Sequence, residues 1–269
     1  STGECFYGVY EGPDRQQMIF DELYRLMMPE LLLVGTLSFQ KELHEFIDLR
    51  MNACSFTAID HVSAAVEDRI VQHFDAANRP ESPAAKAAVA TLLDYLHDTV
   101  KTDLSHLNRL TYLDASANLV VDTYTLRNLE ITRNLRDGGK KDTLLDVLDF
   151  TKTAMGSRLL KKWLEYPLLH IGPINQRLDA VEELVKDFAL RGNLRDGCKE
   201  IYDFERLLTR VEVGAANARD LVALKLSFQA LPGLKELLRT AAAAWLKQAS
   251  ANIDLYADLV DLLERAIVD

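Results

Sequence analysis

The sequence predicts an α/β plus all-α protein, in which a small α/β domain precedes a helical domain. Short apolar runs alternate with helical periodicity over roughly the first hundred residues, and no convincing strand pattern follows residue 122. The 269 residues suit about two domains, and a composition with 48% hydrophobic and 27% charged residues excludes disordered and fibrous proteins. We therefore expect an α/β domain at 1–105 and a helical domain at 106–269.

The first domain is expected to alternate strands and helices. An aromatic, alternating run opens the chain, and short apolar runs bounded by turn residues follow it. Asp14 opens a helical pattern, and Ser38 is the expected N-cap of the next helix. Residues 62–100 have a helical pattern that is interrupted where Pro80 and Pro83 stand close together, and a new helix is expected to start near Pro83. The expected strands are 5–10, 31–34 and 53–59.

Two short extended pieces, at 110–114 and 119–122, lead into the helical domain. From residue 122 onward, apolar residues recur at helical spacing, with turn residues between the successive patterns. Apolar residues within 126–131, 144–148 and 159–164 mark the first three expected helices. Further helices are expected around 173–187, 203–212 and 217–230, and helical periodicity continues to the end. The expected breaks are Gly138-Gly139, Thr151–Thr153, Gly192, Gly197, Gly214 and Pro232-Gly233.

The net charge of −10 argues against a chain that grips DNA by electrostatics alone, because nonspecific phosphate binding depends on Lys and Arg. The acidity is concentrated in the first part. Residues 1–110 contain 9 basic and 17 acidic residues, whereas 111–269 contain 22 basic and 24 acidic residues. An acidic α/β domain beside a nearly neutral helical one is more typical of an adaptor joined to a scaffold than of a DNA groove.

Cysteine usage and the two ends of the chain bear on location and completeness. Cys5, Cys54 and Cys198 are widely spaced and odd in number, which excludes a disulfide framework and a Cys-x-x-Cys metal site. We expect a reducing cytoplasm, and we expect no membrane contact because no apolar stretch is long enough to span a bilayer. Ser1 is not an initiator Met and the helical pattern of 259–269 ends without a cap, so we expect that both ends are cut.

The search for catalytic chemistry assigns no catalytic, cofactor-binding or metal-binding residue. Gly192 and Gly197 have part of the spacing of a phosphate-binding loop, but Cys198 stands where lysine is required, so we interpret this segment as a loop between helices. No Gly-x-Ser-x-Gly motif is present, and carboxylate pairs such as Asp258 with Asp261 are interpreted as solvated faces. Histidines never recur at His-x-His or His-x-x-x-His spacing, which argues against a helical metal site. They are at positions 44, 61, 73, 97, 106 and 170.

Two patterns could in principle contact DNA, and each has a simpler structural explanation. Phe20-Asp21-Glu22 loosely fits a Phe-x-Glu wedge motif, but we expect Phe20 to lie in the core. Arg158, Lys161 and Lys162 share one helical face, which we interpret as solvated rather than bound to phosphate. The same interpretation applies to a second basic group, for which nearby acidic residues are the expected partners. That group is Arg206, Arg210 and Arg219, with Glu205 and Asp220 nearby.

One ordered series of motifs goes beyond composition. It includes Thr-Leu-Arg-Asn-Leu-Glu-Ile-Thr at 125–132, Thr-Leu-Leu-Asp-Val-Leu-Asp at 143–149, Thr-Ala-Met-Gly-Ser-Arg-Leu-Leu at 153–160, Arg-Leu-Asp-Ala-Val at 177–181 and Asp-Phe-Glu-Arg-Leu-Leu at 203–208. In this order the motifs resemble the start of the core domain of the bacterial MutS family of DNA mismatch recognition ATPases. The resemblance covers about residues 111–269. The opening Ser1-Thr2-Gly3-Glu4 is similar to the first strand of that family's connector domain.

The resemblance implies an internal segment of a larger protein: a connector similar to the ribonuclease H fold, followed by the first part of a helical core. It implies that the segment couples the ATPase to the DNA-binding parts and offers a surface to a MutL-like partner. For the whole protein it implies DNA binding, a homodimer, and ATP with Mg²⁺ as cofactors. The family's Gly-x-Phe-Tyr-Glu mismatch reader and its Walker motifs are absent from these 269 residues, so no site residue is transferred and no enzymatic activity is expected of this segment.

Two alternatives remain open from the sequence. A helical protein-interaction scaffold unrelated to repair would have a similar composition, but it would not explain the order of the motifs. A degenerate ribonuclease H-like nuclease would need acidic residues that converge at strand ends to hold two metal ions, and Asp60 is the lone candidate.

Overall fold

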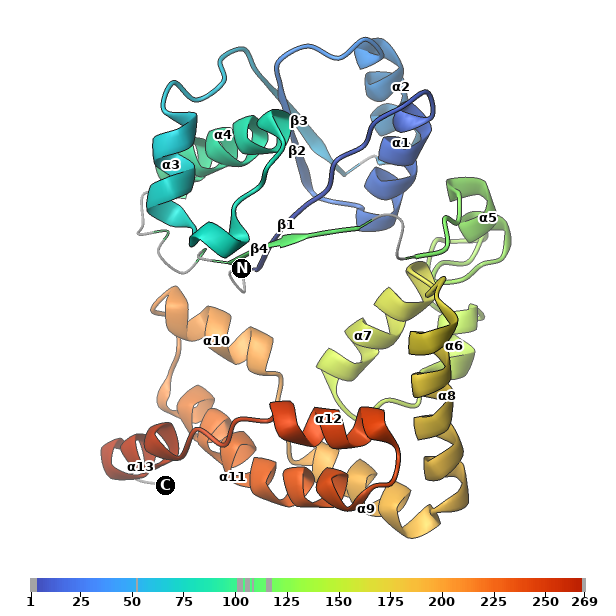
Figure 1. Cartoon of the computed structure of the whole chain (residues 1–269), viewed down its shortest axis with the longest axis vertical. Coiled ribbons are helices and arrows are strands. Elements are labelled where there is room, and N and C mark those ends of the chain that lie inside the picture. Colours follow the sequence, from blue (N-terminus) through green and yellow to red (C-terminus); the bar gives the residue numbers. More distant parts are fainter. Residues whose placement is uncertain are drawn as a thin grey trace. The chain divides into compact units, whose positions relative to one another are not determined.

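The computed structural model describes residues 4–51, 53–100, 104, 107, 109–114 and 118–267, and it divides into two compact units (Figure 1). Unit 1 contains the described residues through 114 together with Val120–Leu129. Unit 2 contains residues 118 and 119 and the chain from Glu130 onward. Within the described residues, no helix is both long and apolar enough to cross a membrane.

Unit 1 contains strands and helices as the alternating pattern predicts, and its described strands form two separate parallel pairs. The strands are β1 (Glu4–Tyr7), β2 (Glu30–Val34), β3 (Ser55–Ile59) and β4 (Arg109–Tyr112). β1 pairs with β4 with Glu4 opposite Arg109, and β2 pairs with β3 with Glu30 opposite Ser55. Parallel pairing requires crossover connections, and helices supply them.

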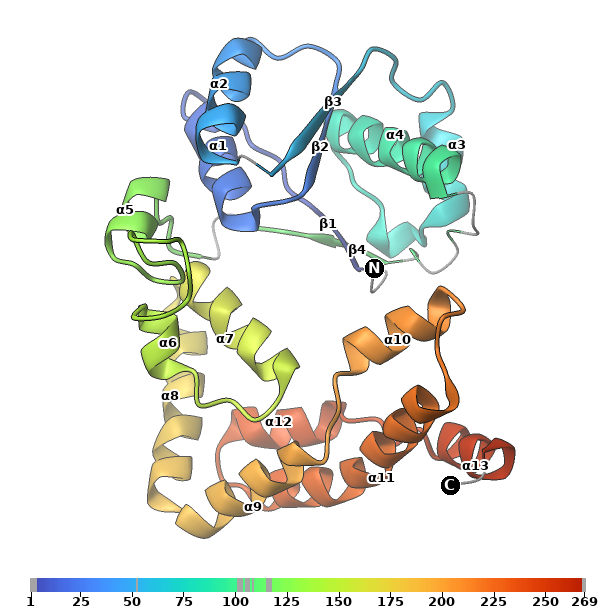
Figure 2. The same cartoon turned by 180° about the vertical axis from the view of Figure 1, so that it is seen from behind.

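The helices of unit 1 lie in two groups on opposite sides of these strands. α1 and α2 are on one side and α3 and α4 on the other, as Figures 1 and 2 agree. The pair α1 and α2 buries Leu23, Leu43 and Ile47, whereas α3 and α4 form a second cluster with Leu110 of β4. The bounds are α1 Arg15–Leu26, α2 Gln40–Arg50, α3 Val66–His73, the 3-10 turn η1 Ala76–Asn78, α4 Pro83–Val100 and α5 Thr123–Asn128.

One expected cap in unit 1 is wrong, and one expected helix start is confirmed. Phe39, not Ser38, is at the N-cap of α2, and no side chain accepts a hydrogen bond there. Phe39 is buried against Phe20, so apolar packing rather than a hydroxyl determines where the chain enters this helix. Pro83 begins α4, the position where a missing backbone N–H costs nothing.

The described part of unit 2 is helical. Its bounds are α6 Leu144–Leu148, α7 Ala154–Glu165, α8 Ile171–Lys186, α9 Phe188–Lys199, α10 Phe204–Glu212, α11 Ala218–Thr240, α12 Ala244–Asn252 and α13 Ala257–Ala266. One cluster around Ala180, Leu190 and Leu246 joins α8, α9, α11 and α12. A second cluster around Leu207 and Phe228 joins α10, α11 and α13.

Three breaks that turn residues predict in unit 2 are wrong. α9 continues through Gly192 and Gly197, and α11 continues through Pro232. A Cβ on Gly197 would lie 2.7 Å from the Leu234 Cδ2 atom, so this glycine permits close packing of α9 on α11. Packing of α11 against α9, α12 and α13 explains why the helix persists despite Pro232. The break at Gly214 is confirmed, with a φ of 68°.

Candidate functional site

Side-chain caps begin most of the helices of unit 2. Thr153 accepts a hydrogen bond from the Gly156 N–H at the start of α7, and Asp203 accepts one from the Arg206 N–H at the start of α10. Each cap satisfies a backbone N–H group that has no partner within the helix. The capping residues of unit 2 are Thr143, Thr153, Asp187, Asp203 and Asn217.

Arg158 connects α7 to the start of α10. Its guanidinium donates hydrogen bonds of 3.0 Å and 2.6 Å to the two carboxylate oxygens of Asp203, and it lies 2.5 Å from a Glu205 oxygen. The hydrogen bond from Arg158 is the main reason that the pKa of Asp203 is below its usual value. The Arg158 side chain is thus 46% exposed and also pairs with carboxylates within the chain. Of the second basic group, Arg210 pairs with Asp220 at 2.9 Å as expected.

Asp149 fixes the turn that precedes α7. Its carboxylate accepts hydrogen bonds of 2.5 Å from Lys140 Nζ, Thr151 Oγ1 and Ser157 Oγ. These bonds, first of all the one from Lys140, lower the pKa of Asp149 far below its usual range. The turn is therefore held in one arrangement at neutral pH.

Asn134 organises the loop before α6 in a similar way. Its side-chain oxygen accepts hydrogen bonds from the N–H groups of Arg136, Asp137 and Gly138, at 2.9 to 3.1 Å. Its amide nitrogen donates to the Lys141 carbonyl at 3.1 Å. The loop is compact because one buried side chain satisfies several backbone groups at once.

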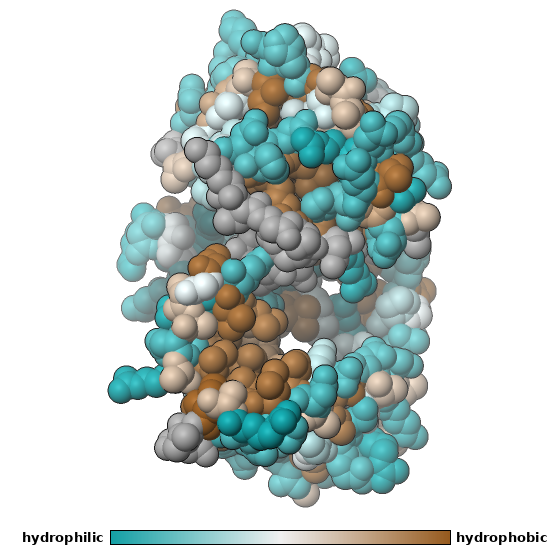
Figure 3. Space-filling model, turned by 90° about the vertical axis from the view of Figure 1, so that its left-hand side faces the viewer, coloured by the Kyte–Doolittle hydropathy of each residue, from teal (hydrophilic) through white to brown (hydrophobic). Residues whose placement is uncertain are grey.

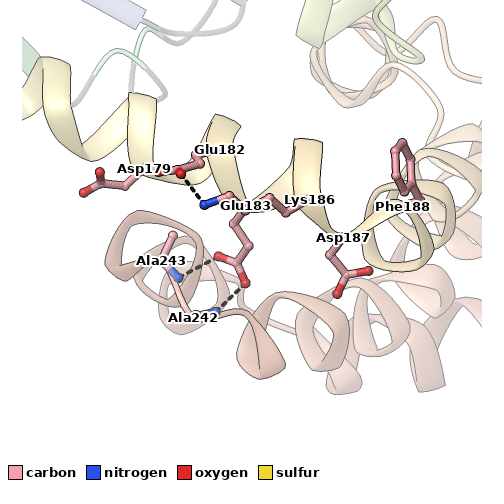
Figure 4. A pocket seen from close by; sticks show the side chains of 8 residues that line it. All are labelled: Asp179, Glu182, Glu183, Lys186, Asp187, Phe188, Ala242 and Ala243. Carbon is pink, nitrogen blue, oxygen red and sulfur yellow. Dashed lines mark hydrogen bonds and ion pairs between the residues drawn. The ribbon is translucent and has the colours of Figure 1, made fainter.

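A pocket of about 680 Å³ opens beside the start of α12 (Figure 4). Its main polar group is already engaged, because the Glu183 carboxylate of α8 accepts hydrogen bonds from the N–H groups of Ala242 and Ala243 at 2.5 and 2.6 Å. Glu183 thus caps α12 from another helix, and its pocket neighbour Lys186 pairs with Glu182. We interpret the pocket as part of the packing between α8 and α12, not as a binding site. Its lining residues are Asp179, Glu182, Glu183, Lys186, Asp187, Phe188, Ala242 and Ala243.

The residues that could have suggested catalysis do not converge in the described parts of the chain. Gly192 and Gly197 lie within α9, so the interpretation as a loop is wrong and the strand-to-helix setting of a phosphate-binding loop is missing. Across the described residues, no three His, Cys, Asp or Glu side chains are placed to share a metal ion. Asp60 is exposed after β3. His106 lies outside the described residues.

Phe20 packs as the sequence predicts, but its neighbour Asp21 has a role that the sequence did not indicate. Phe20 stacks on Phe46 with ring centroids 4.7 Å apart and contacts Phe39 at 5.9 Å. Asp21 is buried, at 4% exposure, and bonds to Thr123 across 102 positions of sequence. No local pattern reports a contact over such a separation.

Unit 2 exposes apolar side chains on two faces. Brown side chains gather on the lower part of the face in Figure 3, which is the side of α10, α11 and α13 in Figure 1. The large exposed apolar residues on these helices include Leu208, Val211, Leu226, Leu259 and Leu262. α8 exposes a stripe at helical spacing, formed by Ile171, Leu178, Val181 and Val185. Contiguous apolar surface is typical of faces that meet other protein surfaces.

Comparisons with known proteins agree with the motif series. A family model described as MutS domain III matches residues 124–269. A DNA mismatch repair protein MutS from Symbiobacterium thermophilum is 40% identical, over 100% of this chain and 31% of that protein. Proteins of the same name from Halothermothrix orenii and Ruminiclostridium cellulolyticum are 38% and 36% identical, over 100% of this chain and 30% and 31% of theirs. The chain thus spans just under a third of the length of these curated relatives.

Proposed function

The chain belongs to the MutS family, and we propose that it serves DNA mismatch repair as a structural segment of a larger mismatch-binding ATPase. The observation that carries this proposal is the match of 124–269 to MutS domain III, together with relatives that cover the whole chain. In that role the segment transmits movement between the part that hydrolyses ATP and the parts that hold DNA. Packed helices whose ends are held by hydrogen bonds are suited to such transmission, because they move as rigid elements.

Unit 1 is proposed to be the connector domain, with a fold similar to ribonuclease H. Parallel strands with helices on both sides support this assignment. The proposed division of the chain remains 1–105 for the connector and 106–269 for the first part of the core. The family match begins at residue 124, and unit 1 extends to Leu129.

The cofactors and partners are proposed for the larger protein. ATP and Mg²⁺ would be bound outside this chain, and DNA would be held by parts that this chain does not contain. A homodimer and a MutL-like partner that contacts the connector complete the proposal, in a cytoplasmic setting. The exposed apolar faces of unit 2 support a segment that meets other protein surfaces.

A chimaera tests this proposal. Because the Symbiobacterium thermophilum protein aligns over the whole chain, its matching region can be replaced by this chain. We expect the chimaera to restore repair in cells that lack MutS, with a deletion of the same region as the negative control. The isolated chain is expected to hydrolyse no ATP and to show no preference for mismatched duplex at about 150 mM salt. A folded chimaera that fails to repair, or turnover by the isolated chain, would overturn the proposal.

Metal-dependent cleavage of nucleic acid by the isolated chain would favour the nuclease alternative. Such cleavage should then disappear in the Asp60→Asn variant. The unrelated-scaffold alternative is disfavoured by the family match.

A further inference from the structure

The chain changes unit within a few residues of Leu119. Residues 118 and 119 belong to unit 2, whereas Val120–Leu129 belongs to unit 1. In unit 2, Asn118 forms an antiparallel bridge with Leu168, and the Leu119 N–H donates a 2.8 Å hydrogen bond to the Pro167 carbonyl. In unit 1, the next residues are bound to α1. Only Val120 therefore lies between the attachment of Leu119 to unit 2 and the attachment of Val121 to unit 1.

Asp21 of α1 makes the central contact with this segment. One carboxylate oxygen accepts hydrogen bonds from the Thr123 N–H at 2.9 Å, from Thr123 Oγ1 at 2.6 Å and from Gln17 Nε2 at 3.0 Å. Asp21 is 4% exposed and Thr123 is 5% exposed. Charge-assisted hydrogen bonds that are shielded from water are among the stronger ones, and breaking them leaves a buried carboxylate without donors.

Arg25 holds the same segment one helical turn further along α1. Its guanidinium donates a 2.8 Å hydrogen bond to the Val121 carbonyl and pairs with Glu22 at 3.0 Å. Only 9% of the Arg25 side chain is exposed. α5, which begins at Thr123, packs on α1 (Figure 2). Side chains four residues apart on one face of α1 thus bind the backbone at both ends of Val121–Thr123.

We propose that Asp21, Arg25, Val121 and Thr123 form a latch that makes α5 a part of unit 1, so that rotation between the units is confined, among the described residues, to Val120 and the Leu129–Glu130 junction. Val120 is 62% exposed. Glu130 has a φ of 46°, a conformation that costs free energy in a residue with a Cβ. Its carboxylate accepts a 2.6 Å hydrogen bond from the Leu135 N–H, which anchors it to unit 2.

The latch determines where movement of unit 2 reaches unit 1. The family match begins at residue 124, within α5, yet α5 is held by α1. A displacement of the helical core would therefore be transmitted to α1, because α5 is bound to α1 and is not a flexible linker. The latch would act in this way in any protein that contains both units, so its test is independent of the proposed role in repair.

Hydrogen exchange tests the latch in the full chain. In Asp21→Ala, amides at 121–129 are expected to exchange about tenfold faster or more, because buried hydrogen bonds are lost. The amides of α8 and α11 should not change. The matched control is Asp122→Ala, which removes the side-chain cap of α5 at Thr125 but leaves every latch contact in place. Equal exchange at 121–123 in Asp21→Ala and in the unmodified protein would overturn the latch.

Should Asp21→Ala not fold, Thr123→Val keeps the shape and removes the 2.6 Å bond alone, and a smaller acceleration of the same amides is expected. Spin labels give a second readout. They can be placed at Lys41 in unit 1 and Lys186 in unit 2, whose side chains are 87% and 72% exposed, after the three cysteines are replaced. The distance distribution should widen about twofold in Asp21→Ala and stay unchanged in Asp122→Ala. Equal widths in all three proteins would contradict a latch that restricts rotation.

Discussion

The two units specify the ends of their helices by different means. In unit 1, α1, α2 and α3 begin without any side-chain hydrogen bond to a cap, and the short α5 begins at the Asp122 side chain. In unit 2, α6, α7, α9, α10 and α11 each begin at a Thr, Asp or Asn side chain that accepts one, whereas the N-cap residues of α8, α12 and α13 do not. Helices packed on strands can be positioned by apolar contacts, whereas short helices joined by tight loops need polar side chains at their ends. Unit 1 should therefore be sensitive to lost apolar volume, and unit 2 to lost caps.

The largest effect is expected from an apolar truncation in unit 1. Leu43→Ala removes a side chain that is 2% exposed in the α1 and α2 cluster, and should lower the free energy of unfolding of unit 1 by about 3 kcal/mol. Leu49→Ala, on the same helix at 76% exposure, is the matched control and should have almost no effect. Hydrogen exchange of α1 and α2 in urea measures both. Similar losses of unfolding free energy in the two variants would contradict the role of apolar packing in unit 1.

A smaller effect is expected from loss of a cap in unit 2. Asp203→Ala removes both the cap of α10 and one of the two carboxylate partners of Arg158, and should cost about 1 to 2 kcal/mol. Trp163 and Trp245 are in edge-to-face contact in unit 2, so their emission during urea unfolding reports this unit. Asp196→Ala removes an exposed ion pair with Lys199 and should cause no measurable loss. An Asp203→Ala protein as stable as the control would show that caps do not define unit 2.

A pair of glycines on α9 sharpens the comparison, because unit 2 also contains one tight apolar contact. Gly192→Ala adds a methyl group with nothing within 4 Å and should stabilise the helix by roughly 0.5 to 1 kcal/mol. Gly197→Ala places the same methyl group 2.7 Å from Leu234, so the gain should be cancelled or reversed. The midpoints of urea unfolding, followed by tryptophan emission, should separate the two variants. Equal gains would mean that Leu234 moves aside freely.

The smallest effect is expected from protonation of Asp149. Its pKa is lowered in the folded state, so the unfolded state binds the proton more tightly and unit 2 loses stability as pH falls. The loss sets in as pH falls toward the unfolded pKa of 3.8, so between about pH 6 and 4 it should be a few tenths of a kcal/mol at most. Asp149→Asn should flatten this dependence. Glu165→Gln should steepen it, because burial raises the pKa of Glu165 and its protonation favours the folded state. If both variants and the unmodified protein show the same dependence of stability on pH, the roles assigned to Asp149 and Glu165 are wrong.

The sequence predicted the order of the strands and of most helices but missed α9, and it located the starts of α7 and α10, which polar caps define. Thr153, the last residue of the expected break at 151–153, caps α7, and Asp203, the first residue of an expected helix, caps α10. Helix ends decided by packing were missed, as the cap at Ser38 and the break at Pro232 show, because tertiary contacts override local propensity. The partners of Asp21 and Arg158 lie 102 and 45 positions away, distances over which no periodicity carries information.

Residues 118 and 119 of unit 2 lie in the sequence between two parts of unit 1, and this arrangement affects folding during synthesis. β1, the first strand, pairs with β4 at residues 109–112, and α1 receives its latch only from residues 121–123. A ribosome that makes the chain from its N-terminus must therefore have released α5 before unit 1 can complete its contacts. By then residues 118 and 119, which belong to unit 2, have already emerged without their partners at 167 and 168. In the nascent chain, unit 1 should therefore complete its folding while residues 118 and 119 still lack their contacts with unit 2.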